Sequence, residues 1–115
     1  MESTPDDRRQ AVVSAIATAR RADDRVEFVA DDTDDRVVFE DRRLRVEVAD
    51  RDRLEALLEE YGVFKVRQPA TRKADDGVVY LSAVTDPKHA ADFVEALFRE
   101  VYDAPRDYRL RVESG

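Results

Sequence analysis

The spacing of apolar residues changes repeatedly along this chain, and this pattern constrains the fold more than any other feature. Over residues 26–48, apolar side chains recur at alternate positions with charged residues between them, which is typical of strands with one buried and one solvated face. Residues 31–35 (DDTDD) and residues 41–42 (Asp-Arg) interrupt the alternation with turn-forming residues. We therefore predict three antiparallel strands joined in sequence by two short polar turns.

Three other segments carry apolar residues at the spacing of an amphipathic helix. Residues 4–22 open with a hydroxyl N-cap and a proline, and their narrow, alanine-rich stripe predicts a helix that lies on the outside of the fold. Residues 50–62 end in Gly62, which should take the left-handed conformation that stops a helix. Residues 86–104 open with Asp-Pro, and Pro105 should end this third helix.

Three further strands are predicted, over residues 63–67, 78–84 and 108–112. The second of them is the most apolar and is expected to be central in the sheet. The element order is then α-β-β-β-α-β-β-α-β, and 115 residues allow one core, so we predict a single domain over residues 1–115. This order predicts an α+β fold: a two-layer sandwich in which an antiparallel sheet has its helices on one face.

The predicted element order resembles that of type III secretion chaperones and their bacterial relatives, with one extra strand at the C-terminal end. Those proteins are small α+β domains that usually dimerise, so the resemblance implies a homodimer. A two-layer fold of this kind leaves one sheet face open, and a second copy is a common way to cover such a face.

Charge is the second constraint. Charged residues make up 41% of the chain, the net charge is −7, and arginine (17) nearly replaces lysine (3). Dense carboxylates hold water, and molar salt screens their mutual repulsion over a Debye length of about 3 Å. Composition and length resemble the short, acidic, uncharacterised proteins of haloarchaea, which implies a halophilic protein. The chain has no apolar run of the roughly 20 residues that a membrane span needs and opens with charged residues, so we expect a soluble, cytoplasmic protein.

Several catalytic classes are excluded or disfavoured by residue type. There is no cysteine, which excludes disulfides, thiolate catalysis and the usual zinc ligand sets, and the single histidine, His89, excludes a histidine pair. We interpret His89 as an exposed residue in the first turn of a helix, where binding of an anion is the alternative. Ser82 lies in a strand with no nucleophile elbow, so a hydrolase relay is not expected. We expect no enzyme, no cofactor and no metal.

Acidic residues are candidates for a cation site and for acid–base pairs. The cluster at residues 31–35 would need glycine and glutamate at the sixth and twelfth positions of an EF-hand loop, but Arg36 and Arg42 stand there, so a solvated turn is predicted. Every acidic residue falls on a solvated face or in a turn of the predicted elements, which argues against a buried acid–base site.

One basic segment stands out from the acidic background. No acidic residue occurs between Glu60 and Asp75, whereas four bases do: Lys65, Arg67, Arg72 and Lys73. The first 60 residues carry 11 bases and 18 acids, and the rest of the chain carries nine of each. The segment could bind an anionic ligand or an acidic partner, or it could pair with acids of neighbouring strands. It lacks a glycine-rich phosphate cradle and interleaved aromatic residues, and the chain is acidic, so nucleic acid is not an expected partner.

Two functions from different classes therefore remain. The first is a non-enzymatic interaction or dimerisation module that forms a homodimer or docks a protein partner. The second is a regulatory domain that binds a small anionic ligand or a nucleotide through the four bases of the segment 65–73.

Overall fold

A computed structural model describes residues 3–22, 24–40, 42–48, 51–62, 64, 66–67, 78–82 and 85–114 of the chain. Its elements follow the predicted order, with a π-helical turn (η1) added after the third helix. They are α1 (Pro5–Ala22), β1 (Val26–Ala30), β2 (Asp35–Glu40), β3 (Arg43–Glu47), α2 (Arg51–Glu60), β4 (Val66–Arg67), β5 (Val78–Ser82), α3 (Pro87–Ala96), η1 (Leu97–Val101) and β6 (Leu110–Ser114).

The strands form one antiparallel sheet in the order β4-β5-β3-β2-β1-β6. Consecutive strands β1, β2 and β3 pair as predicted, and β6 returns from the end of the chain to pair with β1. The prediction that the most apolar strand is central was wrong, because β5 lies next to the edge strand β4. Its apolar character reflects cover on both faces, since Val79 and Leu81 are buried while Val78 and Tyr80 are half-buried on the other face.

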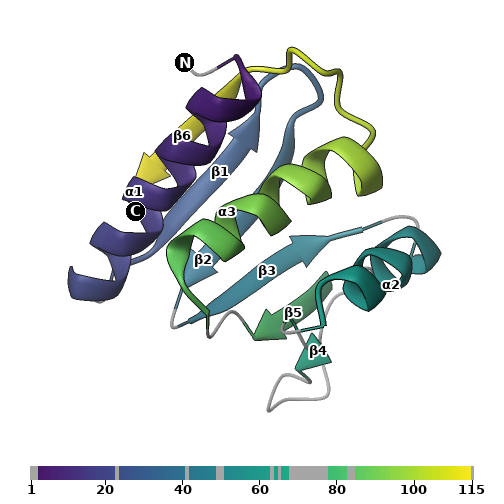
Figure 1. Ribbon diagram of the computed structural model, residues 1–115, viewed down its shortest axis with the longest axis horizontal. Helices are drawn as coiled ribbons and strands as arrows, with labels where there is room; N and C mark the ends of the chain where they lie inside the picture. Colours follow the sequence, from purple (N-terminus) through teal and green to yellow (C-terminus); the bar gives the residue numbers. More distant parts are fainter. Residues whose placement is uncertain are drawn as a thin grey trace.

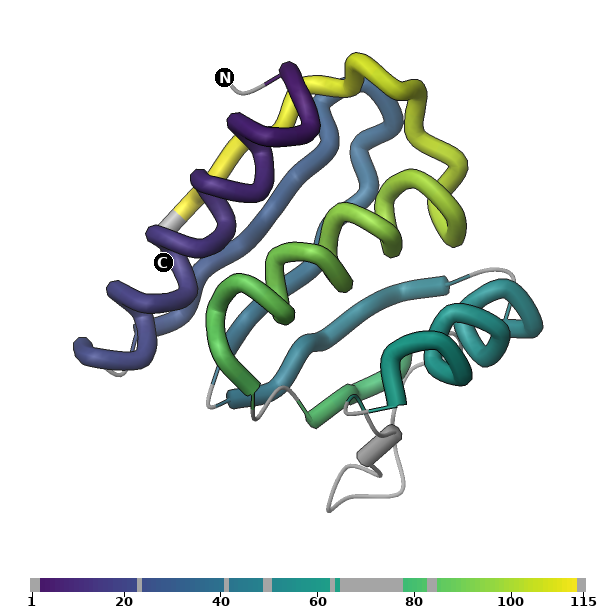
Figure 2. The backbone as a smooth tube through the Cα atoms, in the orientation of Figure 1, coloured from purple at the N-terminus to yellow at the C-terminus, as the bar shows by residue number. Residues whose placement is uncertain are grey.

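All three helices lie on the same face of the sheet, which confirms the two-layer α+β fold (Figure 1). α1 and α3 run side by side over the β6, β1 and β2 half of the sheet, and α2 lies over the half that contains β3 and β5. The tube in Figure 2 shows β6 passing beneath α1, close to the N-terminal end of the chain. α1 thus lies on the outside of the fold, above the β6 edge of the sheet.

The core lies between the helices and the sheet and is built from the predicted apolar stripes. Fully burying one such side chain contributes about 1.5–3 kcal/mol to folding. Its largest members, each at most 1% exposed, come from both layers: Ile16, Phe28, Phe39, Leu44, Leu54, Phe64, Leu81, Phe93, Leu97 and Phe98.

The predicted helix starts are confirmed where the structure describes them. Thr4 Oγ1 accepts a hydrogen bond from Asp7 N (3.2 Å) at the start of α1, and Asp86 Oδ1 accepts one from His89 N (2.9 Å) at the start of α3. The N-cap predicted for α2, at residue 50, lies outside the described residues.

The predicted helix stops were less accurate. Gly62 does not take the left-handed conformation; instead Phe64 N donates to Tyr61 O (3.0 Å) and closes the turn after α2. The third helix ends at Val101, before Pro105, and Asp103 then takes a left-handed φ of 59°. Aspartate tolerates this conformation better than most residues, which allows the chain to turn without glycine.

Candidate functional site: the free edge of β6

The sheet face opposite the helices carries ion pairs rather than an apolar patch. Arg36 Nη1 lies 2.9 Å from Glu27 Oε2 and 3.7 Å from Glu113 Oε2, so arginine and glutamate side chains meet across neighbouring strands. Long charged side chains of this kind cover Val29 and Val38, which are only 0% and 6% exposed. The open face therefore does not offer the apolar surface that a second copy would be expected to cover.

The edge of the sheet at β6 is a different kind of surface. β6 pairs with β1, and no described strand pairs with its other side. Asp31 N donates to Arg109 O (3.0 Å), and because backbone groups alternate along a strand, residues 109, 111 and 113 turn theirs toward β1. Leu110, Val112 and Ser114 therefore direct their N–H and C=O groups to the free edge.

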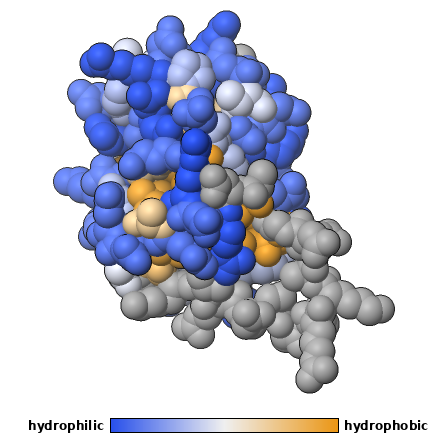
Figure 3. Space-filling view, turned by 90° about the vertical axis from the view of Figure 1, so that its right-hand side faces the viewer, coloured by the Kyte–Doolittle hydropathy of each residue, from blue (hydrophilic) through white to orange (hydrophobic). Residues whose placement is uncertain are grey.

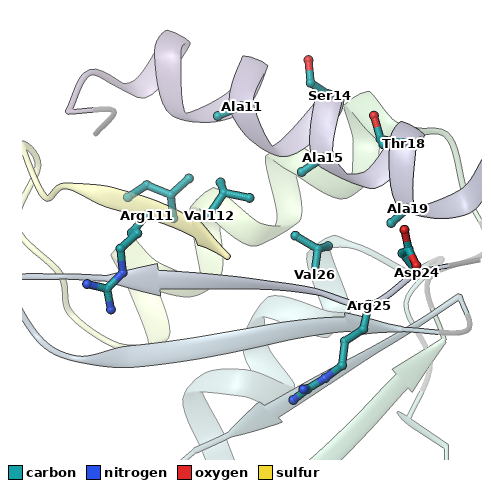
Figure 4. A pocket seen from close by; sticks show the side chains of 11 residues that line it. Ala11, Ser14, Ala15, Thr18, Ala19, Asp24, Arg25, Val26, Arg111 and Val112 are labelled. Carbon is teal, nitrogen blue, oxygen red and sulfur yellow. The ribbon is translucent and has the colours of Figure 1, made fainter. Parts of the chain in front are cut away.

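A groove of about 550 Å³ lies beside this edge, between α1 and β6. Figure 4 shows Val112 pointing toward α1, whereas Arg111 points to the other face of the sheet. Val112 is 38% exposed and is the one large apolar side chain among the described residues that is exposed. The wall on α1 consists of small side chains: Ala11, Ser14, Ala15 and Thr18.

The groove follows from the sequence of α1. Its larger apolar residues, Val12 and Ile16, are at most 2% exposed and pack into the core. The adjacent side of the helix, which faces β6, carries side chains too short to reach Val112. An apolar residue of β6 is consequently left partly uncovered next to an unpaired backbone edge.

Acidic residues of the β1–β2 turn hold β6 in place. Asp32 Oδ2 accepts a hydrogen bond from Arg109 N (2.8 Å), and Asp31 Oδ1 lies 3.3 Å from Arg111 Nη1. No group of three or more potential metal ligands occurs in the described part of the chain. Residues 31–34 form a turn in which residues 32–34 are exposed, and two of its carboxylates bind the neighbouring strand.

The prediction that no acidic residue is buried was wrong. Glu95 on α3 is 8% exposed and Arg8 on α1 is 1% exposed. Arg8 donates from Nε to Glu95 Oε1 (2.8 Å) and from Nη2 to Glu95 Oε2 (2.7 Å), and Tyr108 Oη donates to the same Oε1 (2.8 Å). Helical spacing could have indicated that both residues are buried, because Arg8 stands four residues before buried Val12 and Glu95 four residues after buried Ala91.

This buried cluster has a structural role, because it connects α1 and α3 to the segment that precedes β6. The remaining N–H groups of Arg8 donate to the carbonyls of Ser3 (2.8 Å), Arg106 (3.0 Å) and Tyr108 (3.0 Å), so all five guanidinium donors are used. Burial disfavours the charged form of Glu95, but the hydrogen bonds from Arg8 and Tyr108 outweigh it and hold the pKa of Glu95 below its ordinary value. A carboxylate engaged in this way is a poor proton acceptor for catalysis.

His89 is half-buried rather than exposed as predicted. Its ring stacks on Phe64 (centroids 5.7 Å apart, 9° between planes) and lies 5.7 Å from the ring of Tyr61. The alternative was that His89 binds an anion at the start of the helix. The backbone N–H of His89 is not free for this, because it already donates a hydrogen bond to Asp86 Oδ1.

The predicted ligand-binding bases can be placed only in part. Lys65, Arg72 and Lys73 lie outside the described residues, as does the side chain of Arg67, whose backbone in β4 pairs with Tyr80 of β5. Whether the segment binds an anion therefore stays a prediction.

A hollow of about 410 Å³ lies on the open sheet face, over β2, β3 and β5. Three arginines line it together with an aromatic ring, an apolar floor and one acid: Arg25, Arg43, Arg45, Tyr80, Val38 and Glu40. The sequence did not single out this cluster, because its members come from separate strands and only the pairing of Arg45 with both Val38 and Tyr80 assembles it.

The described residues define a two-layer α+β protein whose distinctive feature is a free sheet edge beside a groove. The chain belongs to a family of unknown function, DUF7975, which matches residues 2–115. No curated protein and no solved structure gives a significant match to it. Among the helices that the structure describes, none has the length and apolar character needed to cross a bilayer.

Proposed function

We propose that this protein is a non-enzymatic interaction module that binds a protein partner, in the first place a second copy of itself, through the free edge of β6. The observation that carries this proposal is the exposed Val112, which stands beside outward-directed backbone groups and an open groove. Unpaired strand edges bind other strands through main-chain hydrogen bonds, and an adjacent pocket adds contacts with side chains.

The edge lacks several of the features that usually protect a strand from such pairing, although Arg111 and Glu113 carry charges on its open face. Natural edges often carry proline, a bulge or a charge directed inward, whereas β6 contains no proline, Leu110 and Val112 are apolar, and its register with β1 is regular. The opposite edge, β4, comprises two residues in the described part of the chain. On the side with α2 and the η1–β6 connection, the described surface is mostly hydrophilic, with apolar residues showing in small areas (Figure 3).

Substitution of Val112 by proline tests this proposal. Proline removes an N–H that points away from β1, so the β1–β6 pairing is kept while the edge is blocked. Val112→Thr is the matched control, because it keeps both the N–H and the branched shape. In molar KCl, light scattering should give a dimer for the wild type and the threonine variant, and a folded monomer for the proline variant. A wild type that stays monomeric at millimolar concentration, with fast amide exchange at Val112, would refute the proposal.

We also propose that the protein works in a cytoplasm of high salt concentration. Its dense charge, with aspartate and arginine in excess over glutamate and lysine, supports this environment. Raising KCl from about 0.1 M to about 1 M shortens the Debye length from about 10 Å to about 3 Å and screens the repulsion among carboxylates. The melting temperature should therefore rise steeply with KCl, and a flat or falling dependence would contradict the proposal.

The arginine-lined hollow favours a second candidate function, binding of a small anion or nucleotide. Arg43 forms no ion pair with any described residue, and Tyr80 offers a ring beside it. Pyrophosphate and a nucleoside triphosphate, tested by thermal shift, should stabilise the wild type but not Arg43→Ser. Arg51→Ser, on the exposed side of α2, is the control. If neither ligand stabilises the wild type, this candidate is wrong.

A further inference from the structure

We infer that the partner of the β6 edge is a second copy of this chain, paired antiparallel across a two-fold axis at Val112. This inference rests on the proposed function of the edge and adds the register in which the two copies pair. Its central evidence is that the charges of β6 are complementary to those of β6 itself in this register.

The backbone allows this arrangement. Val112 is the middle one of the three residues, Leu110, Val112 and Ser114, whose backbone groups point outward. With the axis at Val112, the two copies of that residue exchange hydrogen bonds with each other, and each Leu110 does so with the other copy's Ser114. All three outward residues then have partners, and the interface is the same surface on both copies.

The charges select this register over its neighbours. With the axis at Val112, Arg111 of each copy stands opposite Glu113 of the other, which gives two cross-strand pairs of opposite charge. Moving the axis to residue 111 would place the two Arg111 side chains opposite each other, and moving it to residue 113 would do the same for the two Glu113 side chains. Like charges directly opposite are destabilising in a sheet, so the register at Val112 is favoured.

Existing contacts extend across the axis without rearrangement. Within one copy, Arg111 Nε lies 3.0 Å from Glu113 Oε1, on the open face, and both side chains are 41% exposed. Pairing two copies would turn this ion pair into a square of four charges, in which each charge has opposite charges beside it along its own strand and across from it on the other. The other charged neighbours, Asp31 beside Arg111 and Arg36 beside Glu113, already balance the same two groups.

The helix side supplies apolar contact that persists in strong salt. The two Val112 side chains would meet there, each next to a groove whose α1 wall consists of small side chains. These short residues leave room for the second copy's α1 beside the first. Apolar contact and backbone hydrogen bonds would supply the affinity, while the charges, which salt screens, would mainly set the register.

An exchange of charges tests the inference. Arg111→Glu places two glutamates opposite each other at both pairs, and Glu113→Arg places two arginines there, so each single variant should dimerise about tenfold more weakly than the wild type. The double variant R111E/E113R should recover wild-type dimerisation. A mixture of the two single variants should form heterodimers, because the charges are complementary again. Native mass spectrometry and light scattering, at the lowest KCl concentration that keeps the fold cooperative, measure all four.

The matched control uses another pair on the same face. Arg45 Nη2 lies 3.3 Å from Glu47 Oε1 on β3, away from the edge, so R45E and E47R should leave dimerisation unchanged. If the wild type dimerises and Val112→Pro does not, but single charge variants dimerise as tightly as the wild type or form no preferred heterodimer, the register is wrong while the edge proposal stands. A wild type that is strictly monomeric overturns both. Heterodimer formation also shows that each single variant is folded.

Discussion

The guanidinium of Arg8 on α1 and the carboxylate of Glu95 on α3 meet at two points in the core, with nitrogen–oxygen distances of 2.8 Å and 2.7 Å. Tyr108 joins the pair through its hydroxyl, and the centroid of its ring lies 3.9 Å from Cζ of Arg8. Because Tyr108 stands two residues before β6, this cluster connects both helices to the strand that forms the free edge. It therefore contributes to the spacing between α1 and β6, and so to the groove.

Glu95→Gln should destabilise the protein strongly. The amide keeps the shape of the side chain but leaves the charge of Arg8 buried without a counter-ion, which typically costs about 3–5 kcal/mol. Urea unfolding followed by circular dichroism measures the loss. The control is Arg9→Ala, because the Arg9–Asp92 pair (3.1 Å) is about half exposed and should be worth less than about 1 kcal/mol. Equal effects of the two variants would show that the buried pair has no special role.

Stability should depend on pH through the same cluster. The pKa of Glu95 is lower in the folded state, so its stabilising contribution is complete above the ordinary glutamate pKa of about 4.3 and is lost as the pH falls toward the lower folded value. Burial, reinforced by Glu95, raises the pKa of Tyr108, so stability should also fall as the pH rises above about 10, where the unfolded tyrosine ionises. Unfolding free energies measured from pH 3 to 11 should show both slopes, and Tyr108→Phe should reduce the alkaline one.

Local patterns of the sequence predicted most of the fold. The alternation over residues 26–48 and the helical stripes of α1 and α3 depend on near neighbours in the chain, so the elements and the single-faced helix layer could be derived. The position of β5 beside an edge and the pairing of β6 with β1 depend on contacts between distant segments. Hydrophobicity alone does not encode such contacts, which explains why β5 was expected to be central.

The candidate site was predictable only in fragments. Val112 falls within the predicted last strand, but its exposure depends on where that strand lies in the sheet and on the short side chains of α1 above it. Arg8 and Glu95 could have been found, since each interrupts an apolar stripe at a helical spacing. The high overall charge concealed them, because a charged residue in this chain is most often a surface residue.

Arg42 gives a prediction about backbone conformation. It takes a left-handed φ of 58° in the β2–β3 turn and is exposed. Glycine adopts this conformation without steric cost, so Arg42→Gly should be neutral or stabilise the protein by up to about 1 kcal/mol. The adjacent Arg43 lies in β3 and is the matched control, because glycine in a strand should cost about 0.5–1 kcal/mol. A larger loss for Arg42→Gly than for Arg43→Gly, in thermal or urea unfolding, would contradict this reading of the turn.

Asp32 gives a prediction about the free edge. Its carboxylate accepts a hydrogen bond from Arg109 N (2.8 Å) and so holds the residue that precedes β6 against the β1–β2 turn. Asp32→Ala should cost about 1 kcal/mol and raise the amide exchange rate of Arg109 about fivefold, while Asp32→Asn should lose less because it keeps an acceptor oxygen. Thr33→Ala in the same exposed turn is the control. Because the dimer proposed here needs an ordered β6, Asp32→Ala should also weaken dimerisation, and an unchanged dissociation constant would show that the start of β6 does not contribute to the interface.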